Sequence, residues 1–277
     1  MTVVPTLPLL DGNTVPAVGF GSPDVDPARG EALFLEALDA GYRLIDTAQA
    51  YGNEEVVGAA LARTSVPREK IQVATKISGA NQGRKPTLSS FEESRRKLGV
   101  DYVDFLLIHW PNPEYDLYVE TWGAMIELRD RGVVRSIGVC NFTDAFLQRL
   151  EDETGVLPVV NQIERHPLFP NQAQVDSDAR RGIVTESWSA LGRGHAFVDD
   201  PVIAGIAAAH GVTAGQVVLR WHVQGGSVPL SYSTRAERIR QNIDVFSFAL
   251  TDDEMTAVSG LETGRIWGQD PADSNYL

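Results

Sequence analysis

Four side chains that can hold or exchange a proton lie at or near the ends of predicted strands. Asp46, Lys76 and His109 each end a short apolar run, and Tyr51 follows in the segment Asp46-Thr-Ala-Gln-Ala-Tyr51. A tyrosine with its ordinary pKa of about 10 is a poor acid at neutral pH unless a nearby cation stabilises the phenolate. Lys76 can supply that charge, Asp46 can hold Lys76, and His109 can hydrogen-bond a substrate oxygen. The matching reaction is proton donation to a carbonyl group that receives a hydride.

Each of these residues also has an ordinary structural interpretation. Asp46 and Lys76 could form an ion pair that only stabilises the fold. His109, with apolar neighbours on both sides, could be a core histidine, and Tyr51 could anchor a loop. Taken singly, these structural interpretations are favoured. Four such residues at strand ends on one rim reverse the balance, because barrel enzymes place their working groups there.

The elements that must position these residues are short apolar runs that alternate with longer amphipathic stretches. A hairpin comes first, with the turn Asp11-Gly12-Asn13 between two brief strands at 7–10 and 15–18. The predicted barrel strands are 17–21, 43–46, 71–76, 103–109, 134–139, 159–163, 183–188 and 227–230. The predicted helices are 27–40, 53–63, 87–98, 117–131, 145–153, 171–180, 201–210, 217–222, 235–242 and 252–261. A Thr-Leu-Ser-Ser cluster would open the helix at 87, and Thr251 with Glu254 would cap the last one.

Eight strand–helix units in 277 residues predict an α/β fold, a closed (β/α)8 TIM barrel with the hairpin at its bottom. The apolar strands are typical of a sheet covered on both faces. No Gly-x-Gly-x-x-Gly follows the first strand, which argues against a doubly wound dinucleotide-binding sheet. Because the composition has no linker-like break, we expect a single domain over residues 1–277, with 264–277 as a loop-like tail.

Composition and charge exclude several classes of protein. The chain has 37 acidic and 24 basic residues and a net charge of −13, which opposes a broad nucleic-acid or anionic-membrane surface. Cys140 is the single cysteine, so an internal disulfide is excluded. No signal peptide, transmembrane-length apolar run or Cys/His cluster with metal-ligand spacing is present. We therefore expect a cytoplasmic, monomeric protein with no metal and no nucleic-acid or membrane partner.

Four segments resemble signatures of the aldo-keto reductase family. They are Gly41-Tyr-Arg-Leu-Ile-Asp46-Thr-Ala-Gln-Ala-Tyr51-Gly-Asn-Glu54, Leu98-Gly-Val-Asp101-Tyr-Val-Asp104-Phe-Leu-Leu-Ile-His109-Trp-Pro111, Arg135-Ser-Ile-Gly138-Val-Cys140-Asn141-Phe142 and Val160-Asn161-Gln162-Ile-Glu-Arg-His166-Pro167. The resemblance runs from the first hairpin to about Leu261 and is strongest to the bacterial branch that includes 2,5-diketo-D-gluconate reductases. It implies an oxidoreductase that uses NADPH, rather than NADH, to reduce a small aldehyde or ketone to an alcohol.

The resemblance also implies a role for each matching residue. Tyr51 would donate the proton and Lys76 would lower its pKa. Asp46 would support Lys76, and His109 would orient the carbonyl, with Trp110 beside it in the substrate pocket. The implied cofactor residues are Asn141 and Gln162 at the nicotinamide amide, Trp188 stacked on the nicotinamide ring, Ser189, Leu191 and Arg193 at the pyrophosphate, and Tyr232, Ser233, Arg238, Gln241 and Asn242 at the adenosine 2′-phosphate and adenine.

The sequence departs from the family pattern at several places. Tyr232 stands where the family has a lysine that pairs with the 2′-phosphate, so selectivity for NADPH should rest on Arg238, which can grip a phosphate through two donors. Cys140 replaces a serine. Pro23, and Ser78 or Gly79, replace aromatic residues, which implies a wider and less aromatic substrate pocket. In the tail, Trp267 and Tyr276 either fold over the pocket or are disordered.

Two other functions compete with the reductase. Some relatives are β-subunits of potassium channels, so a nucleotide-sensing regulatory barrel with weak or no reductase activity is an alternative. The complete set of Tyr51, Lys76, Asp46 and His109 argues against that loss of catalysis. A phosphosugar isomerase would need a carboxylate base and a glycine-rich phosphate loop near the last two strands, for which only 189–194 is a faint candidate.

Overall fold

Eight parallel strands form a closed barrel in the computed structural model, which describes residues 4–23, 25–194, 196–274 and 276. The barrel strands are β3 (Gly19–Gly21), β4 (Leu44–Asp46), β5 (Gln72–Ile77), β6 (Val103–Ile108), β7 (Val134–Cys140), β8 (Val160–Glu164), β9 (Val184–Trp188) and β10 (Ser227–Ser231). Their order is β10-β3-β4-β5-β6-β7-β8-β9, and β10 pairs with β3 to close the sheet. The predicted (β/α)8 barrel is confirmed.

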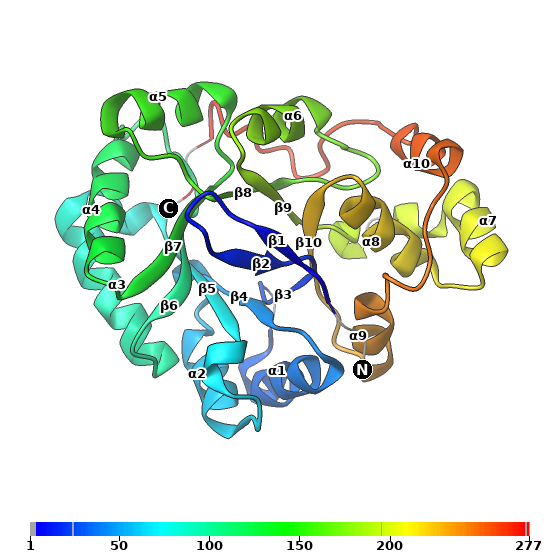
Figure 1. Ribbon diagram of the computed structural model, residues 1–277, viewed down its shortest axis with the longest axis horizontal. Coiled ribbons are helices and arrows are strands. Elements are labelled where there is room, and N and C mark those ends of the chain that lie inside the picture. Colours follow the sequence, from blue (N-terminus) through cyan, green and yellow to red (C-terminus); the bar gives the residue numbers. More distant parts are fainter. Residues whose placement is uncertain (1–3, 24, 195, 275, 277) are drawn as a thin grey trace.

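Helices form a ring around this barrel, as Figure 1 shows. They are α1 (Pro27–Ala40), α2 (Glu54–Arg63), α3 (Arg84–Leu98), α4 (Tyr118–Asp130), α5 (Asp144–Thr154), α6 (Gln172–Arg180), α7 (Pro201–His210), α8 (Ala214–Gln224), α9 (Ala236–Ile243) and α10 (Asp252–Ser259). Each barrel strand is followed along the chain by at least one of these helices. The amphipathic stretches of the sequence therefore cover the outside of an apolar sheet.

The sequence prediction was wrong about where two helices begin. We expected a helix from residue 87, but α3 starts at Arg84 because Gly83, with φ of 92°, turns the chain just before it. We expected a helix from residue 217, but α8 starts at Ala214. Thr213 and Gln216 form a capping box there, which satisfies main-chain groups at the start of the helix.

The N-terminal hairpin covers the bottom of the barrel, where the strands begin. It consists of β1 (Thr6–Pro8) and β2 (Thr14–Pro16), which pair antiparallel and cross the barrel opening in Figure 1. Leu9 and Val15 pack against the apolar side chains of the barrel interior. In the turn, Asp11 accepts a hydrogen bond from Ser136 Oγ at 2.7 Å. The interior is thereby closed to solvent at this end, as predicted.

The barrel interior changes from apolar to polar along the strands. Side chains two residues apart lie on the same face of a strand. The apolar layer includes side chains from four of the strands, Leu44, Ala74, Val160 and Val184. Two residues further along those strands lie four buried polar side chains, Asp46, Lys76, Gln162 and Glu186. These four side chains form a polar layer at the C-terminal end of the barrel, where barrel enzymes carry their active sites.

Within the part of the chain that the structure describes, no single helix is long and apolar enough to cross a membrane. α7 and α8 pass such a test only when they are taken together, and they are bent by 90° relative to each other. Ile203 of α7 and Val217 of α8 are fully buried in one apolar cluster, together with Val258 of α10.

Candidate active site

A cavity of about 1030 Å³ opens at the C-terminal ends of the barrel strands. Asp46, Tyr51, His109 and Trp110 line it. Every residue predicted to hold the cofactor lines the same cavity: Asn141, Gln162, Trp188, Ser189, Leu191, Arg193, Tyr232, Ser233, Arg238, Gln241 and Asn242. Lys76 is fully buried and lies behind Asp46, outside the lining. The fold thus gathers residues from distant parts of the chain around one space.

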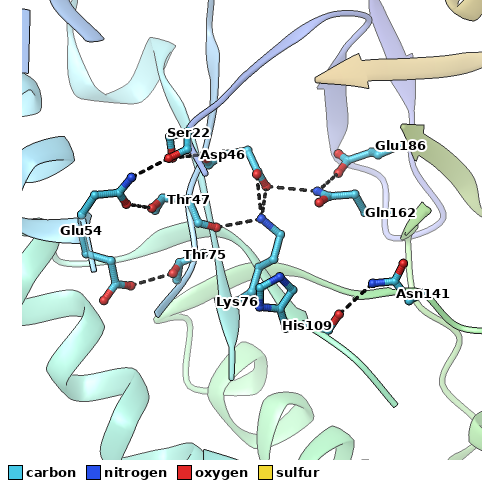
Figure 2. A network of polar contacts seen from close by, with 11 residues as sticks. Ser22, Asp46, Thr47, Glu54, Thr75, Lys76, His109, Asn141, Gln162 and Glu186 are labelled. Carbon is cyan, nitrogen blue, oxygen red and sulfur yellow. Dashed lines mark hydrogen bonds and ion pairs between the residues drawn. The ribbon is translucent and has the colours of Figure 1, made fainter. Parts of the chain in front are cut away.

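Lys76 and Asp46 form a buried ion pair beneath the cavity (Figure 2). Lys76 Nζ lies 2.7 Å from each carboxylate oxygen of Asp46 and donates to the carbonyl oxygen of Thr47 at 2.9 Å. Burial by itself lowers the pKa of Lys76, but the charge of Asp46 raises it above its ordinary value. The ammonium is therefore protonated, and a positive charge is fixed beside the cavity.

A second buried network holds the loop between β4 and α2. The Asn53 side chain accepts a hydrogen bond from Thr47 Oγ1. On β5, Thr75 Oγ1 donates to Glu54 Oε1 at 2.6 Å, and both side chains are buried. Figure 2 shows the contact between Thr75 and Glu54 on one side of Asp46. Because Tyr51 belongs to the same loop, the network limits where its side chain can lie.

Tyr51 and His109 face each other across the same part of the cavity. Their ring centroids are 5.6 Å apart, and the rings meet at 80°. Lys76 Nζ lies 5.0 Å from the centroid of the Tyr51 ring. His109 Nδ1 is buried and has no hydrogen-bond partner among the described residues. Two side chains that can hydrogen-bond a substrate oxygen therefore lie next to a fixed positive charge.

Burial controls the protonation of both rings. It raises the pKa of Tyr51 to about 12, although the Lys76 ammonium acts in the opposite direction. We expected Lys76 to lower the pKa of Tyr51; that effect is present, but burial outweighs it. Burial, followed by the charge of Lys76, lowers the pKa of His109 to about 3. At neutral pH, Tyr51 therefore keeps its proton and His109 is uncharged.

Asn141 connects the ends of three barrel strands. It directly follows β7, and its φ of 63° places it in the left-handed region, which asparagine tolerates better than most residues. Its Nδ2 donates to the carbonyl oxygen of His109 at 3.1 Å. Its Oδ1 accepts from Trp188 Nε1 at 2.8 Å. This pair of contacts fixes the orientation of the Trp188 indole at the cavity wall.

The α9 end of the cavity carries exposed guanidinium groups. Arg238 of α9 lines it, is exposed, and has no ion-pair partner among the described residues. Arg235 lines it as well and lies 3.8 Å from Glu237. The Tyr232 ring packs 6.0 Å from Phe20, between the core and the cavity. This end of the cavity is thus suited to an anionic group such as a phosphate.

The described part of the tail folds over the cavity, which decides between the two alternatives left open by the sequence. Trp267 and Tyr276 both line the cavity. The buried carboxylate of Glu164 accepts hydrogen bonds from the main-chain N–H groups of Ile266 at 2.9 Å and Trp267 at 3.4 Å. The tail is therefore tied to the end of β8. It also supplies aromatic side chains to a pocket that we expected to be less aromatic.

Several residues of the site were not identified from the sequence. Glu186 hydrogen-bonds Gln162 beneath the cavity. It could have been found from the alternation along β9, because Val184 two residues earlier also faces the interior. The start of α8, Thr213–Gly215, lines the cavity, and the Thr-x-x-Gln capping pattern was the available signal. For Gln269 in the tail no sequence signal exists.

The side chains around the cavity suit a ligand that carries both an aromatic amide and a phosphate. The Asn141 amide bonds both Trp188 and the main chain of His109, the Gln162 amide bonds Asp46, and Arg238 of α9 lines the same cavity. Within residues 4–23, 25–194, 196–274 and 276, no group of three or more His, Cys, Asp or Glu side chains could hold a metal ion. A nicotinamide dinucleotide has the required chemistry.

The chain is similar in sequence to aldo-keto reductases over almost its whole length. The model of the "Aldo/keto reductase family" matches residues 17–263. An aldo-keto reductase from Mycolicibacterium smegmatis is 48% identical over 272 residues, which are 98% of this chain and 98% of that protein. A 2,5-diketo-D-gluconic acid reductase B from a Corynebacterium species is 47% identical over 271 residues, with the same coverage of both chains.

Solved structures show the same fold. The crystal structure of an aldo/keto reductase from Brucella melitensis superimposes with a TM-score of 0.90 at 43% identity, covering 94% of this chain and 100% of that one. A mutant of Gox0644, crystallised in complex with NADPH, superimposes with a TM-score of 0.93 at 40% identity. That match covers 99% of this chain and 100% of the other.

Proposed function

The chain belongs to the aldo/keto reductase family, and we propose that it reduces a small aldehyde or ketone to an alcohol with NADPH, with Tyr51 as the proton donor. The observation that carries this proposal is the arrangement of Tyr51 and His109 at one cavity, with the Lys76 ammonium 5.0 Å from the Tyr51 ring. The structural relative that was crystallised with NADPH supports the choice of cofactor.

The proton step follows from the protonation states. His109 is neutral, so its imidazole can donate a hydrogen bond to the carbonyl oxygen without giving up a proton. Tyr51 keeps its proton until an oxygen with developing negative charge lies beside it. When Tyr51 transfers that proton, the phenolate left behind is stabilised by Lys76, which Asp46 and Thr47 hold in place. Bound NADPH supplies the hydride.

The residues of the cavity divide into two binding regions for the cofactor. Trp188, Asn141 and Gln162 would hold the nicotinamide end, because an indole can stack on the ring and the amides can pair with the carboxamide. Ser189, Leu191 and Arg193 would lie along the pyrophosphate. At the other end, Ser233, Arg238, Gln241 and Asn242 would bind the adenosine 2′-phosphate and adenine, with Tyr232 beside them.

Arg238 would then be the main source of selectivity for NADPH over NADH, because it is an exposed guanidinium at the cavity without an ion-pair partner in the described chain. A bidentate guanidinium–phosphate contact is one of the stronger hydrogen-bonded pairs in proteins. We further infer that residues 1–277 form one barrel domain. A monomeric state and a cytoplasmic location remain predictions.

The test is oxidation of NADPH, followed by its absorbance, with a panel of aldehydes and ketones that includes sugar-derived diketones. Turnover of at least one carbonyl, with loss of that turnover in Tyr51→Phe, supports the proposal. If the protein binds NADPH tightly but turns over no carbonyl, the reductase function is wrong and a nucleotide-sensing barrel replaces it.

A further inference from the structure

Glu186 is a buried carboxyl group beneath the cavity that the proton step does not use. It lies on β9 directly opposite Gln162 of β8, in the register of the parallel pair. It is 2% exposed, and its side chain does not line the cavity, whereas that of Gln162 does. Any effect of Glu186 on a bound molecule must therefore pass through a neighbouring side chain.

The neighbour is the amide of Gln162, which lies between two carboxyl groups. Gln162 Nε2 donates to Glu186 Oε2 at 2.9 Å and to Asp46 Oδ1 at 3.1 Å, as Figure 2 shows. An amide nitrogen has two hydrogens, so both are used. The reverse orientation of the amide would place its oxygen against the Asp46 carboxylate, which is ion-paired with Lys76. Gln162 Oε1 is left with no hydrogen bond to the described residues, and it can only accept one.

We propose that Glu186 is a positioning residue for the cofactor, because it holds the Gln162 amide so that only its oxygen is offered to the cavity. A ligand group that donates an N–H at this place is then selected, and the carboxamide NH₂ of a nicotinamide ring is such a group. The inference rests on the proposed function, since it takes a nicotinamide dinucleotide as the ligand. It adds a residue that acts on that ligand only through Gln162.

The charges around Glu186 make this positioning sensitive to pH. Asp46, Lys76 and Cys140 are the titratable groups that interact with it, from β4, β5 and β7. Burial, and then the charge of Asp46, raises the pKa of Glu186 to about 7, while Gln162 and Lys76 act in the opposite direction. The ionised carboxylate is a stronger acceptor than the neutral acid. The hydrogen bond from Gln162 to Glu186 should therefore strengthen as pH rises through neutrality.

The experiment measures equilibrium binding of two probes by quenching of tryptophan fluorescence, at about pH 5.5 and about pH 8. NADP⁺ carries the nicotinamide carboxamide. Adenosine 2′,5′-bisphosphate carries the 2′-phosphate and adenine and has no nicotinamide. The variant is Glu186→Gln, which keeps the size of the side chain and removes its charge. Asp178→Asn is the matched control, because Asp178 is also a buried carboxyl group with a raised pKa, bound instead by Asn161.

We expect Glu186→Gln to weaken NADP⁺ binding about fivefold at the higher pH, the order of one hydrogen bond, and by less at the lower pH. Glu186→Gln should bind the bisphosphate like the wild type at both pH values. Asp178→Asn should bind both probes like the wild type. In a Gln162→Ala background the effect of Glu186→Gln should vanish, because the two residues act as one unit. This cycle separates positioning from a general loss of stability.

The inference would be overturned if Glu186→Gln weakened the binding of both probes equally, or weakened the binding of neither. A fivefold effect that persists unchanged in the Gln162→Ala background would also overturn it. Failure of the proposed function gives different results: without the cofactor site the wild-type protein binds neither probe, and without reductase activity it binds NADPH but turns over no carbonyl. Circular dichroism and the midpoint of thermal unfolding verify that each variant is folded before it is titrated.

Discussion

The side chain of Asn112 is hydrogen-bonded twice to the main chain of Tyr276. Its Nδ2 donates to the Tyr276 carbonyl oxygen at 3.0 Å, and its Oδ1 accepts from the Tyr276 N–H at 2.7 Å. The centroid of the Tyr276 ring lies 5.6 Å from that of the His109 ring and 5.8 Å from that of the Trp110 ring. A buried asparagine after β6 therefore holds the end of the tail against the part of the cavity where the carbonyl would bind.

This relationship predicts that Asn112→Gly weakens substrate binding. Glycine tolerates the left-handed φ of 47° at this residue, so the change removes the two hydrogen bonds with little backbone strain. We expect KM for carbonyl substrates to rise about three- to tenfold while the Kd for NADPH stays the same. Asp116→Gly is the control, because Asp116 has a similar φ of 52° in the same loop but pairs with Arg149. An equal rise in KM in both variants would contradict the role of Asn112.

Tyr51→Phe tests the proton donor. The variant loses the phenolic proton and keeps the ring that packs against His109. Because loss of a general acid costs about 10²–10⁴-fold, kcat should fall by that factor. Affinity for NADPH should change little, since the hydroxyl acts on the carbonyl oxygen. Steady-state kinetics and fluorescence titration measure the two quantities, and a variant with more than about a tenth of the wild-type kcat would refute the assignment.

Lys76→Met should lower both activity and stability. It removes the cation that stabilises the Tyr51 phenolate and leaves Asp46, 4% exposed at the side chain, without its partner. Breaking a buried ion pair costs about 3–5 kcal/mol of unfolding free energy. The double variant Asp46→Asn/Lys76→Met should recover part of that stability without recovering turnover. Urea unfolding and a pH–rate profile measure both effects, and a wild-type profile in Lys76→Met would show that the lysine plays no part in the proton step.

The raised pKa of Glu186 predicts a pH-dependent stability difference. Burial raises this pKa from 4.5 to about 7, so the folded state binds the proton more tightly than the unfolded state does. The stabilisation is complete below the unfolded pKa and is lost as pH rises through the folded one. Relative to the wild type, Glu186→Gln should therefore gain stability between about pH 4.5 and pH 7, on the order of 3 kcal/mol. Urea titrations across this range measure the difference, which must stay constant if Glu186 does not titrate there.

Cofactor selectivity should depend on Arg238. Arg238→Ala should remove most of the preference for NADPH over NADH, because no other predicted contact supplies a bidentate partner for the 2′-phosphate. Tyr232→Lys should increase the affinity for NADPH several-fold. The new lysine gains one charge-assisted contact with the phosphate, but the variant loses the packing of the Tyr232 ring against Phe20. Binding of NADH should change little in both variants. Titrations at fixed ionic strength give the ratios, since the contact is screened by salt. If Arg238→Ala leaves the ratio of NADPH to NADH affinity unaltered, the 2′-phosphate does not bind at Arg238.

Local sequence determined the architecture and the strand-end residues, whereas the cofactor residues around the cavity came from the resemblance to the aldo-keto reductases. Apolar runs that alternate with amphipathic stretches are sufficient for a (β/α)8 barrel, because each pattern records which face of its element is buried. The strand ends then locate Asp46, Lys76 and His109 on one rim, since parallel strands end together. The start of α3 was missed because Gly83 turns the chain through its own backbone, a signal that hydrophobic periodicity does not contain.

Tertiary structure alone decided how these groups affect one another. Asp46 and Glu186 share the Gln162 amide although the three residues come from three strands, and Asn112 meets Tyr276 across 164 residues of sequence. The positive charge of Lys76 acts to lower the pKa of Tyr51, but burial raises that pKa by more. The reason is physical: burial depends on every element that excludes water from a side chain, and hydrogen bonds depend on distances of a few tenths of an ångström. Neither quantity is encoded in the spacing of residues along the chain.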